Sequence, residues 1–326
     1  MKSPKLGAII LIIAAICSWF AVMHARVAPK LLNVSYGPTT GIFKQYDADF
    51  ASNWKQSTAS TIGVKQSHGG SLEQAKAILN GLDADTLTLG IALDVVPLAK
   101  AGVIRQDWDS EFPNHNVPYT TPIVFVVRKG NPKGIKDWPD LIKPGVHIVT
   151  PKAKVCAGGR WNFLAAWGWA DLTQGGKGAA LRYVSQLYAH APILDGSWRG
   201  SMRTFVDRGQ GDVLIAWENE ALTILKDHSR DYEIIRPPLT IRSEQPIALV
   251  DRNVDKHGTR RAATAYLKGL YSVDGQRVVA ENFYRPIYTI GIPAATLANF
   301  PKINEFTFEQ VFGNWNSAQQ EYLVLR

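Results

Sequence analysis

The sequence predicts an α/β protein of two lobes, each built on a mostly parallel sheet, with two interlobe crossings. The chain has 326 residues, more than a single hydrophobic core usually organises. Short apolar runs that end in glycine or hydroxyl residues alternate with amphipathic stretches, which is the pattern of a parallel sheet with helical connections. The β-branched run "IVFVVRKGNP" at 123–132 suits a strand that is buried or that crosses between lobes.

The first predicted strand is "LLNVSYG" at 31–37, which ends before a proline. An amphipathic helix follows it, because apolar side chains recur every three to four residues at Phe43, Tyr46, Phe50 and Trp54. The same scheme returns as the strand and glycine loop "IGVKQSHGGS" at 62–71 with the helix at 72–81, and the strand "ADTLTLG" at 84–90 comes next. These units predict one parallel sheet.

The middle of the chain repeats the alternation. "VHIVTPKAK" at 146–154 and the start of "GQGDVLIAWENEALTIL" at 209–225 are predicted strands that lead into helices. After 232–251 the chain is expected to cross back and to finish in helices. Two crossings assign residues 29–121 and 243–326 to lobe 1 and residues 122–242 to lobe 2.

The N-terminus has the layout of a secretory signal peptide. A short basic start, "MKSPK", precedes an uninterrupted apolar run that ends before "HARVAPK". Residues 1–28 are therefore predicted to be a signal peptide, with an uncleaved membrane anchor or a lipid attached at Cys17 as alternatives. Each reading places the body outside the cytoplasm, in the periplasm, where Cys156 would be its only cysteine and could form no internal disulfide.

Charge and metal-ligand patterns exclude several classes of protein. The net charge is +8, but three of the positive charges lie in the N-terminal segment. No dense stripe of lysine and arginine with interleaved aromatic residues is present, so nucleic-acid binding is not expected. The seven histidines and the single body cysteine show no metal-ligand spacing, and no cofactor is expected.

Four segments share one arrangement, a strand that ends in small or hydroxyl residues before a helix. They are "SYGPT" at 35–39, "SHGGS" at 67–71, "VCAGG" at 155–159 and "SWRGS" at 197–201. Ligands collect at such carboxyl ends of strands, and the unpaired N–H groups of a helix start favour an anion. Four such loops in a two-lobed body predict an anion site.

The third loop leaves an alternative open, because Cys156 at a helix start could be a nucleophile of lowered pKa. No histidine is adjacent in sequence, and His68 is only a guess as the activating base. We therefore predict no catalytic residue, and keep a Cys156-dependent enzyme of sulfur chemistry as the competing hypothesis.

Several blocks together resemble the periplasmic sulfate-binding proteins, a family that includes thiosulfate binders. They are "LLNVSYGPT", "QSHGGS", "RWNFLAAWGWA", "RGSMRTFVDRGQGDVLIAWENEA" and "ENFYRP", in this order from Leu31 almost to the C-terminus. The resemblance implies a class-II-type periplasmic binding protein fold, a monomer, and delivery of sulfate or a related oxyanion to an ABC transporter permease. Membrane contact would come only through an uncleaved N-terminal segment, and a tethered sensing receptor is an alternative role.

The resemblance also implies ligand contacts, through backbone amides, a serine hydroxyl and a tryptophan indole. By position in the motifs these fall on Gly37, Ser71, Cys156, Ala157, Gly158, Trp198 and Trp217. Ser71 matches an amide-and-hydroxyl contact, and Trp217 matches the indole donor. Arg160 and Arg199 are expected to brace the loops through salt bridges and not to act as ligand cations.

Four of these positions depart from the family's residues, and one of them is Ala157, which stands where the family has glycine and requires a negative φ there. Gly37 replaces an aspartate whose amide is used, Cys156 replaces a serine hydroxyl by a weaker S–H donor, and Trp198 replaces a small residue. A site of donors alone suits sulfate, which only accepts hydrogen bonds, whereas a protonated oxyanion would leave an O–H unpaired. Cys156 and Trp198 therefore keep thiosulfate or another oxyanion open as the ligand.

Overall fold

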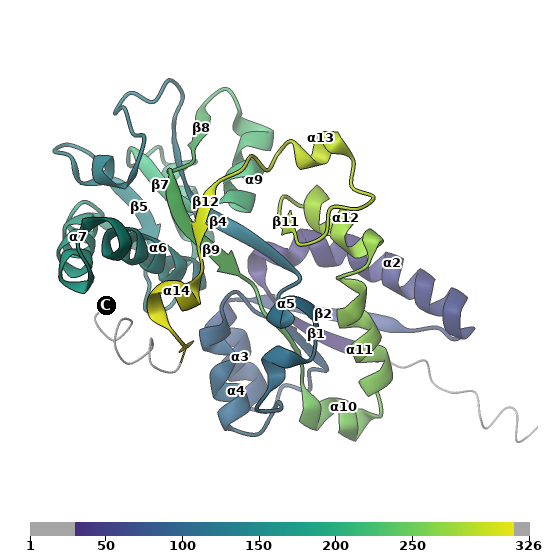
Figure 1. Ribbon diagram of the computed structural model, residues 1–326. Helices are drawn as coiled ribbons and strands as arrows, with labels where there is room; N and C mark the ends of the chain where they lie inside the picture. The colour runs from purple at the N-terminus through teal and green to yellow at the C-terminus, as the bar shows by residue number, and fades with distance from the viewer. Residues whose placement is uncertain (1–29, 316–326) are drawn as a thin grey trace, which may run out of the picture.

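The computed structural model describes residues 30–315, so the predicted N-terminal signal lies outside the described residues. Two sheets organise the chain (Figure 1). The first has the strand order β10-β3-β1-β2. Its strands are β1 Lys30–Tyr36, β2 Gly63–Gly69, β3 Thr86–Thr88 and β10 Ile247–Leu249. β1 runs parallel to β2 and β3, whereas β10 is antiparallel to β3.

The second sheet follows the order β12-β9-β4-β7-β5-β6, and β8 and β11 also pair with β4. Its strands are β4 Tyr119–Arg128, β5 Ile148–Pro151, β6 Ile193–Asp195, β7 Val213–Trp217, β8 Tyr232–Ile235, β9 Leu239–Glu244, β11 Arg285–Pro286 and β12 Asn304–Phe306. β5 is parallel to β6 and β7, and β4 is antiparallel to its neighbours. Both sheets are thus mixed, and the predicted α/β fold is confirmed.

Helices cover both sheets. They are α2 Thr40–Thr58, α3 Ser71–Leu79, α4 Val96–Lys100, α5 Pro113–Asn116, α6 Ala157–Gln174, α7 Lys177–Ala189, α8 Trp198–Phe205, α9 Glu218–His228, α10 Asp251–His257, α11 Arg260–Gly269, α12 Val273–Glu281, α13 Ala294–Leu297 and α14 Phe308–Phe312, with single turns η1 Gly37–Thr39, η2 Ala92–Asp94, η3 Trp108–Ser110 and η4 Trp138–Ile142. None of the described helices is long and apolar enough to span a membrane.

The helix that follows the third predicted loop, α6, is the central helix of the second half. Every residue from Ala157 to Ala170 is buried, so the helix is enclosed on all sides. Gly168 allows this enclosure, since a Cβ there would lie 2.4 Å from the ring of Phe306 on β12. The helix ends at Gly175, whose φ of 101° is in the left-handed region that glycine tolerates best.

The chain passes from the first sheet to the second before β4 and back between β9 and β10 (Figure 1). It then makes a return that the sequence did not indicate. After α12 the chain runs back so that β12 pairs in parallel with β9 in the second sheet, and α14 packs on α6. The predicted lobe boundaries stay a proposal, and residues 304–312 lie with the second sheet.

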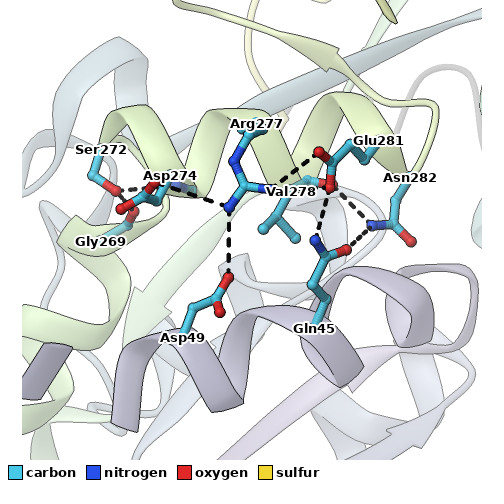
Figure 2. Close-up of polar contacts among 10 residues, drawn as sticks. Gln45, Asp49, Gly269, Ser272, Asp274, Arg277, Val278, Glu281 and Asn282 are labelled. Carbon is cyan, nitrogen blue, oxygen red and sulfur yellow. Dashed lines mark hydrogen bonds and ion pairs between the residues drawn. The ribbon is translucent and has the colours of Figure 1, made fainter. Parts of the chain in front are cut away.

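In the first half, α2 and α12 pack against each other. The buried face of α2 consists of Ile42, Phe43, Tyr46 and Phe50, and the fourth residue of the predicted face, Trp54, is partly buried against the same core. On the outer side, Arg277 of α12 pairs with Glu281 at 3.0 Å and reaches toward Asp49 of α2, and Gln45 donates to Glu281 at 2.7 Å (Figure 2). These exposed contacts add little stability compared with the apolar face beneath them.

Candidate functional site

The predicted ligand residues sit at the starts of helical segments. Gly37 is the first residue of η1, Ser71 of α3, Ala157 of α6 and Trp198 of α8, and Trp217 directly precedes α9. No side chain caps the start of α6, whereas on the first turn of α9 the Asn219 N–H donates to Thr121 Oγ1 at 3.2 Å. The first N–H groups of α6 therefore keep their capacity to bind an acceptor.

Close contacts within each half, and one between the halves at Gly90 and Ala157, bring these starts together. The Gly90 N–H donates to Ser71 Oγ at 3.1 Å, and a Cβ placed on Gly90 would lie 3.0 Å from the Ala157 Cβ. A Cβ on Gly158 would lie 2.8 Å from the ring of Trp217. Both close approaches require glycine. The one at Gly90 leaves no room for a side chain between the loop after β3 and the start of α6.

Three aromatic rings fill the space between the helix starts. Tyr36, at the end of β1, packs its ring against Trp217 at the end of β7, with centroids 5.4 Å apart and planes at 70°. Trp198 also packs on Trp217, with centroids 6.4 Å apart and planes at 61°. Strand ends of both sheets thus meet in one buried aromatic cluster.

Each of the two tryptophans already has an acceptor for its indole N–H. Trp217 Nε1 donates to Ser243 Oγ at 2.8 Å, and Trp198 Nε1 donates to Glu220 at 2.5 Å. The role of Trp217 as a ligand donor stays a prediction, and it would require the indole to exchange Ser243 for the ligand. The sequence reasoning missed Ser243, which lies on β9 and gives no local motif signal.

Ser71 and Cys156 differ in what they can offer a ligand. Ser71 Oγ accepts the Gly90 N–H, so its own hydroxyl proton is left to donate. The Cys156 N–H donates to the Lys152 carbonyl at 3.1 Å. The residue is 8% exposed, and its thiol forms no disulfide. From Cys156, therefore, only the weak S–H donor is available.

Arg160 on the first turn of α6 is not a free cation. It makes two bonds to the Asp94 carboxylate, at 2.7 and 2.8 Å, and both side chains are buried. The expectation that Arg160 braces the loops is confirmed. Arg199 is exposed, and it lowers the pKa of His68, after burial, which is the larger cause.

Glu220 is the acidic group of the site. Burial raises the pKa of its carboxyl to about 7, while the bond from Trp198 and the charge of Arg199 act in the opposite direction. His68 hydrogen-bonds Ser35 through Nδ1 at 2.5 Å, so it is oriented by the end of β1. Within residues 30–315, no group of three or more histidine, cysteine or acidic residues is placed to hold a metal ion.

Comparisons with known proteins define the class to which this arrangement belongs. Residues 33–285 match the family described as bacterial extracellular solute-binding protein, and the chain belongs to this family. Over 297 residues it is 46% identical to the sulfate-binding protein of Escherichia coli, covering 90% of both chains. It is also 40% identical over 302 residues to the thiosulfate-binding protein of Pseudomonas aeruginosa, covering 92% of this chain and 91% of that one.

A solved structure agrees with these sequence relatives. The sulfate-binding protein SubI from Mycobacterium tuberculosis superposes with a TM-score of 0.79 at 28% identity, over 90% of this chain and 99% of that one. The resemblance stated from the motifs and the two-lobed binding-protein fold are therefore confirmed.

Proposed function

We propose that this protein captures sulfate between its two halves and delivers it to an ABC importer. The observation that carries the proposal is the close approach of the uncapped start of α6, at Ala157, to Gly90, whose N–H bonds the Ser71 hydroxyl. Gly37, Ser71, Cys156, Ala157, Gly158, Trp198 and Trp217 are the proposed ligand contacts.

The chemistry of the site favours a fully ionised oxyanion. Arg160, the guanidinium on the first turn of α6, is taken up by Asp94, so charge is offered to the ligand mainly as helix-start dipoles and hydroxyl groups. Sulfate accepts hydrogen bonds at all four oxygens, whereas hydrogen phosphate would bring an O–H that needs an acceptor. Leaving such a bond unmade costs on the order of 1–3 kcal/mol, which discriminates between the two anions.

Thiosulfate is the second candidate ligand. Cys156 replaces a strong donor by a polarizable thiol at the start of α6, and a thiosulfate-binding relative is 40% identical. The terminal sulfur of thiosulfate is a poorer acceptor than oxygen, so it loses less at the Cys156 position than a sulfate oxygen does.

We assign no catalytic role to Cys156. His68, the base considered for it, is bonded to Ser35, and a nucleophilic thiol requires an activating base within hydrogen-bond reach. The proposed receptor acts in the periplasm as a monomer after removal of residues 1–28, and its protein partner is the permease.

Titration calorimetry with sulfate, thiosulfate, molybdate, phosphate and a sulfonate tests the proposal. Sulfate is expected to bind most tightly, with thiosulfate next and phosphate much weaker. A folded protein that binds none of these anions contradicts the proposal, and stronger binding of thiosulfate than of sulfate assigns the receptor to the second ligand.

A further inference from the structure

Tyr36 carries a buried hydroxyl group that is unpaired among the described residues. Tyr36 is the last residue of β1, directly before Gly37, and it is 4% exposed. A buried hydroxyl without a partner is destabilising, and a ligand that reaches it can satisfy it.

The surroundings of Tyr36 show that it faces the site. The ring packs edge-on against Trp217, and a Cβ on Gly90 would touch it at 3.1 Å. The groups that act electrostatically on its hydroxyl are Cys156, Glu220, Tyr284 and Arg160, none of which belongs to the first sheet that carries Tyr36. The ring thus lies between Trp217 of the second half and Gly90 of the first, where the proposed ligand contacts gather.

The hydroxyl also keeps its proton. Burial raises the pKa of Tyr36 well above its ordinary value, and the nearby Cys156 and Glu220 act in the same direction. A group in this state can donate to an anion but adds no negative charge to the site.

We propose that the Tyr36 hydroxyl donates a hydrogen bond directly to the bound oxyanion. The inference rests on the proposed function and adds a contact that compensates for two weak ones. Cys156 offers only a thiol, and the Trp217 indole is engaged by Ser243 in the structure. The Tyr36 O–H is a strong donor in the same cluster and breaks no existing bond when a ligand arrives.

Tyr36→Phe removes the hydroxyl and leaves the ring contacts with Trp217 and Gly90. The dissociation constant for sulfate, measured by calorimetry, is expected to rise about ten-fold or more, because a hydrogen bond to a charged group is lost. The melting temperature of the ligand-free protein is expected to stay the same or to rise, because no bond within the protein is lost.

Tyr119→Phe is the matched control. Tyr119 is also fully buried with an unpartnered hydroxyl, but its ring packs on Tyr284 in the cluster around α2 and α11. This variant is expected to bind sulfate as the wild type does. In the sulfate-bound crystal structure, Tyr36 Oη is expected about 2.7 Å from a ligand oxygen.

Three outcomes overturn the inference. Tyr36→Phe could bind sulfate with wild-type affinity, or it could lower the ligand-free melting temperature, which would assign the hydroxyl to a bond within the protein. In both cases the wild type still binds sulfate, so the proposed function survives. Absence of oxyanion binding by the wild type overturns the inference and the proposed function together.

Discussion

Arg160 and Asp94 form a buried ion pair that ties the start of α6 to the turn η2 in the other half of the molecule. Two bonds of 2.7 and 2.8 Å join them, and their side chains are 5% and 1% exposed. Beside this pair, Trp161 Nε1 donates to the Gly90 carbonyl at 2.8 Å. The helix that carries the proposed ligand contacts Ala157 and Gly158 is thus fixed to the loop after β3, and the two halves are held together at the site.

Asp94→Asn is expected to lower the free energy of unfolding by about 3–5 kcal/mol, because it leaves the Arg160 guanidinium buried without a counter-charge. Urea denaturation followed by circular dichroism measures this loss. Asp107→Asn is the control, since its pair with Arg105 is exposed at 61% and 45%, and a change within about 1 kcal/mol is expected. Equal losses in the two variants would contradict the role given to burial.

The sequence was sufficient for the parts of the site that depend on local signals. Gly37, Ser71, Ala157 and Trp198 were placed at helix starts because glycine and hydroxyl residues mark strand-helix turns within a few residues. The family blocks then joined these turns into one site. Local patterns also gave most of the buried face of α2 and the strands β1 to β5 and β7.

Partners that are distant in the chain could not be predicted in this way. Ser243 accepts the Trp217 N–H from 26 positions away, and Asp94 holds Arg160 from 66 positions away. Neither acceptor has a sequence pattern of its own, because the pairing depends on how two halves of the fold approach each other. The return of β12 to the second sheet was missed for the same reason, since a strand of three residues carries little periodicity.

Cys156→Ser is expected to tighten sulfate binding by up to about ten-fold, because a hydroxyl donates to an anion more strongly than a thiol does. The substitution is small, and no disulfide is lost. Calorimetry with sulfate and thiosulfate on the same preparation measures both affinities. Cys156→Ala is the control and is expected to weaken binding slightly; weaker sulfate binding by the serine variant would show that the thiol is adapted to another ligand.

Trp217→Phe is expected to weaken sulfate binding about ten-fold, because the proposed site loses an indole donor. Ser243→Ala gives the opposite expectation. It removes the acceptor that now holds the indole N–H, so the ligand no longer competes with a protein oxygen and its affinity should rise. Calorimetry on both variants checks the signs, and unchanged affinity in Trp217→Phe would remove Trp217 from the ligand contacts.

Ser243→Ala should also be less stable than the wild type. Ser243 Oγ accepts from Gln245 Nε2 at 3.0 Å as well as from Trp217, so two buried donors lose their acceptor. A loss of about 1–3 kcal/mol in the free energy of unfolding is expected. A gain in affinity together with this loss in stability distinguishes release of the indole from a general loosening of the site.

Glu220 is expected to make stability depend on pH in the neutral range. Burial raises the pKa of its carboxyl in the folded protein to about 7, above its ordinary value of 4.5. The folded state therefore holds a proton that the unfolded chain has released. The resulting stabilisation is complete below about pH 4.5 and is lost as the pH rises through 7, with an upper limit of about 3 kcal/mol.

Glu220→Gln should flatten this dependence, because glutamine keeps an acceptor for the Trp198 indole but cannot ionise. Denaturation of both proteins from pH 5 to pH 8 gives the difference between their free energies of unfolding, in which the other titrating groups cancel. The wild type should lose stability relative to the variant as the pH rises, and parallel profiles would contradict the raised pKa.

Trp198→Phe supplies a second test: the Trp198 bond lowers the pKa of Glu220, so its removal should move the transition to higher pH.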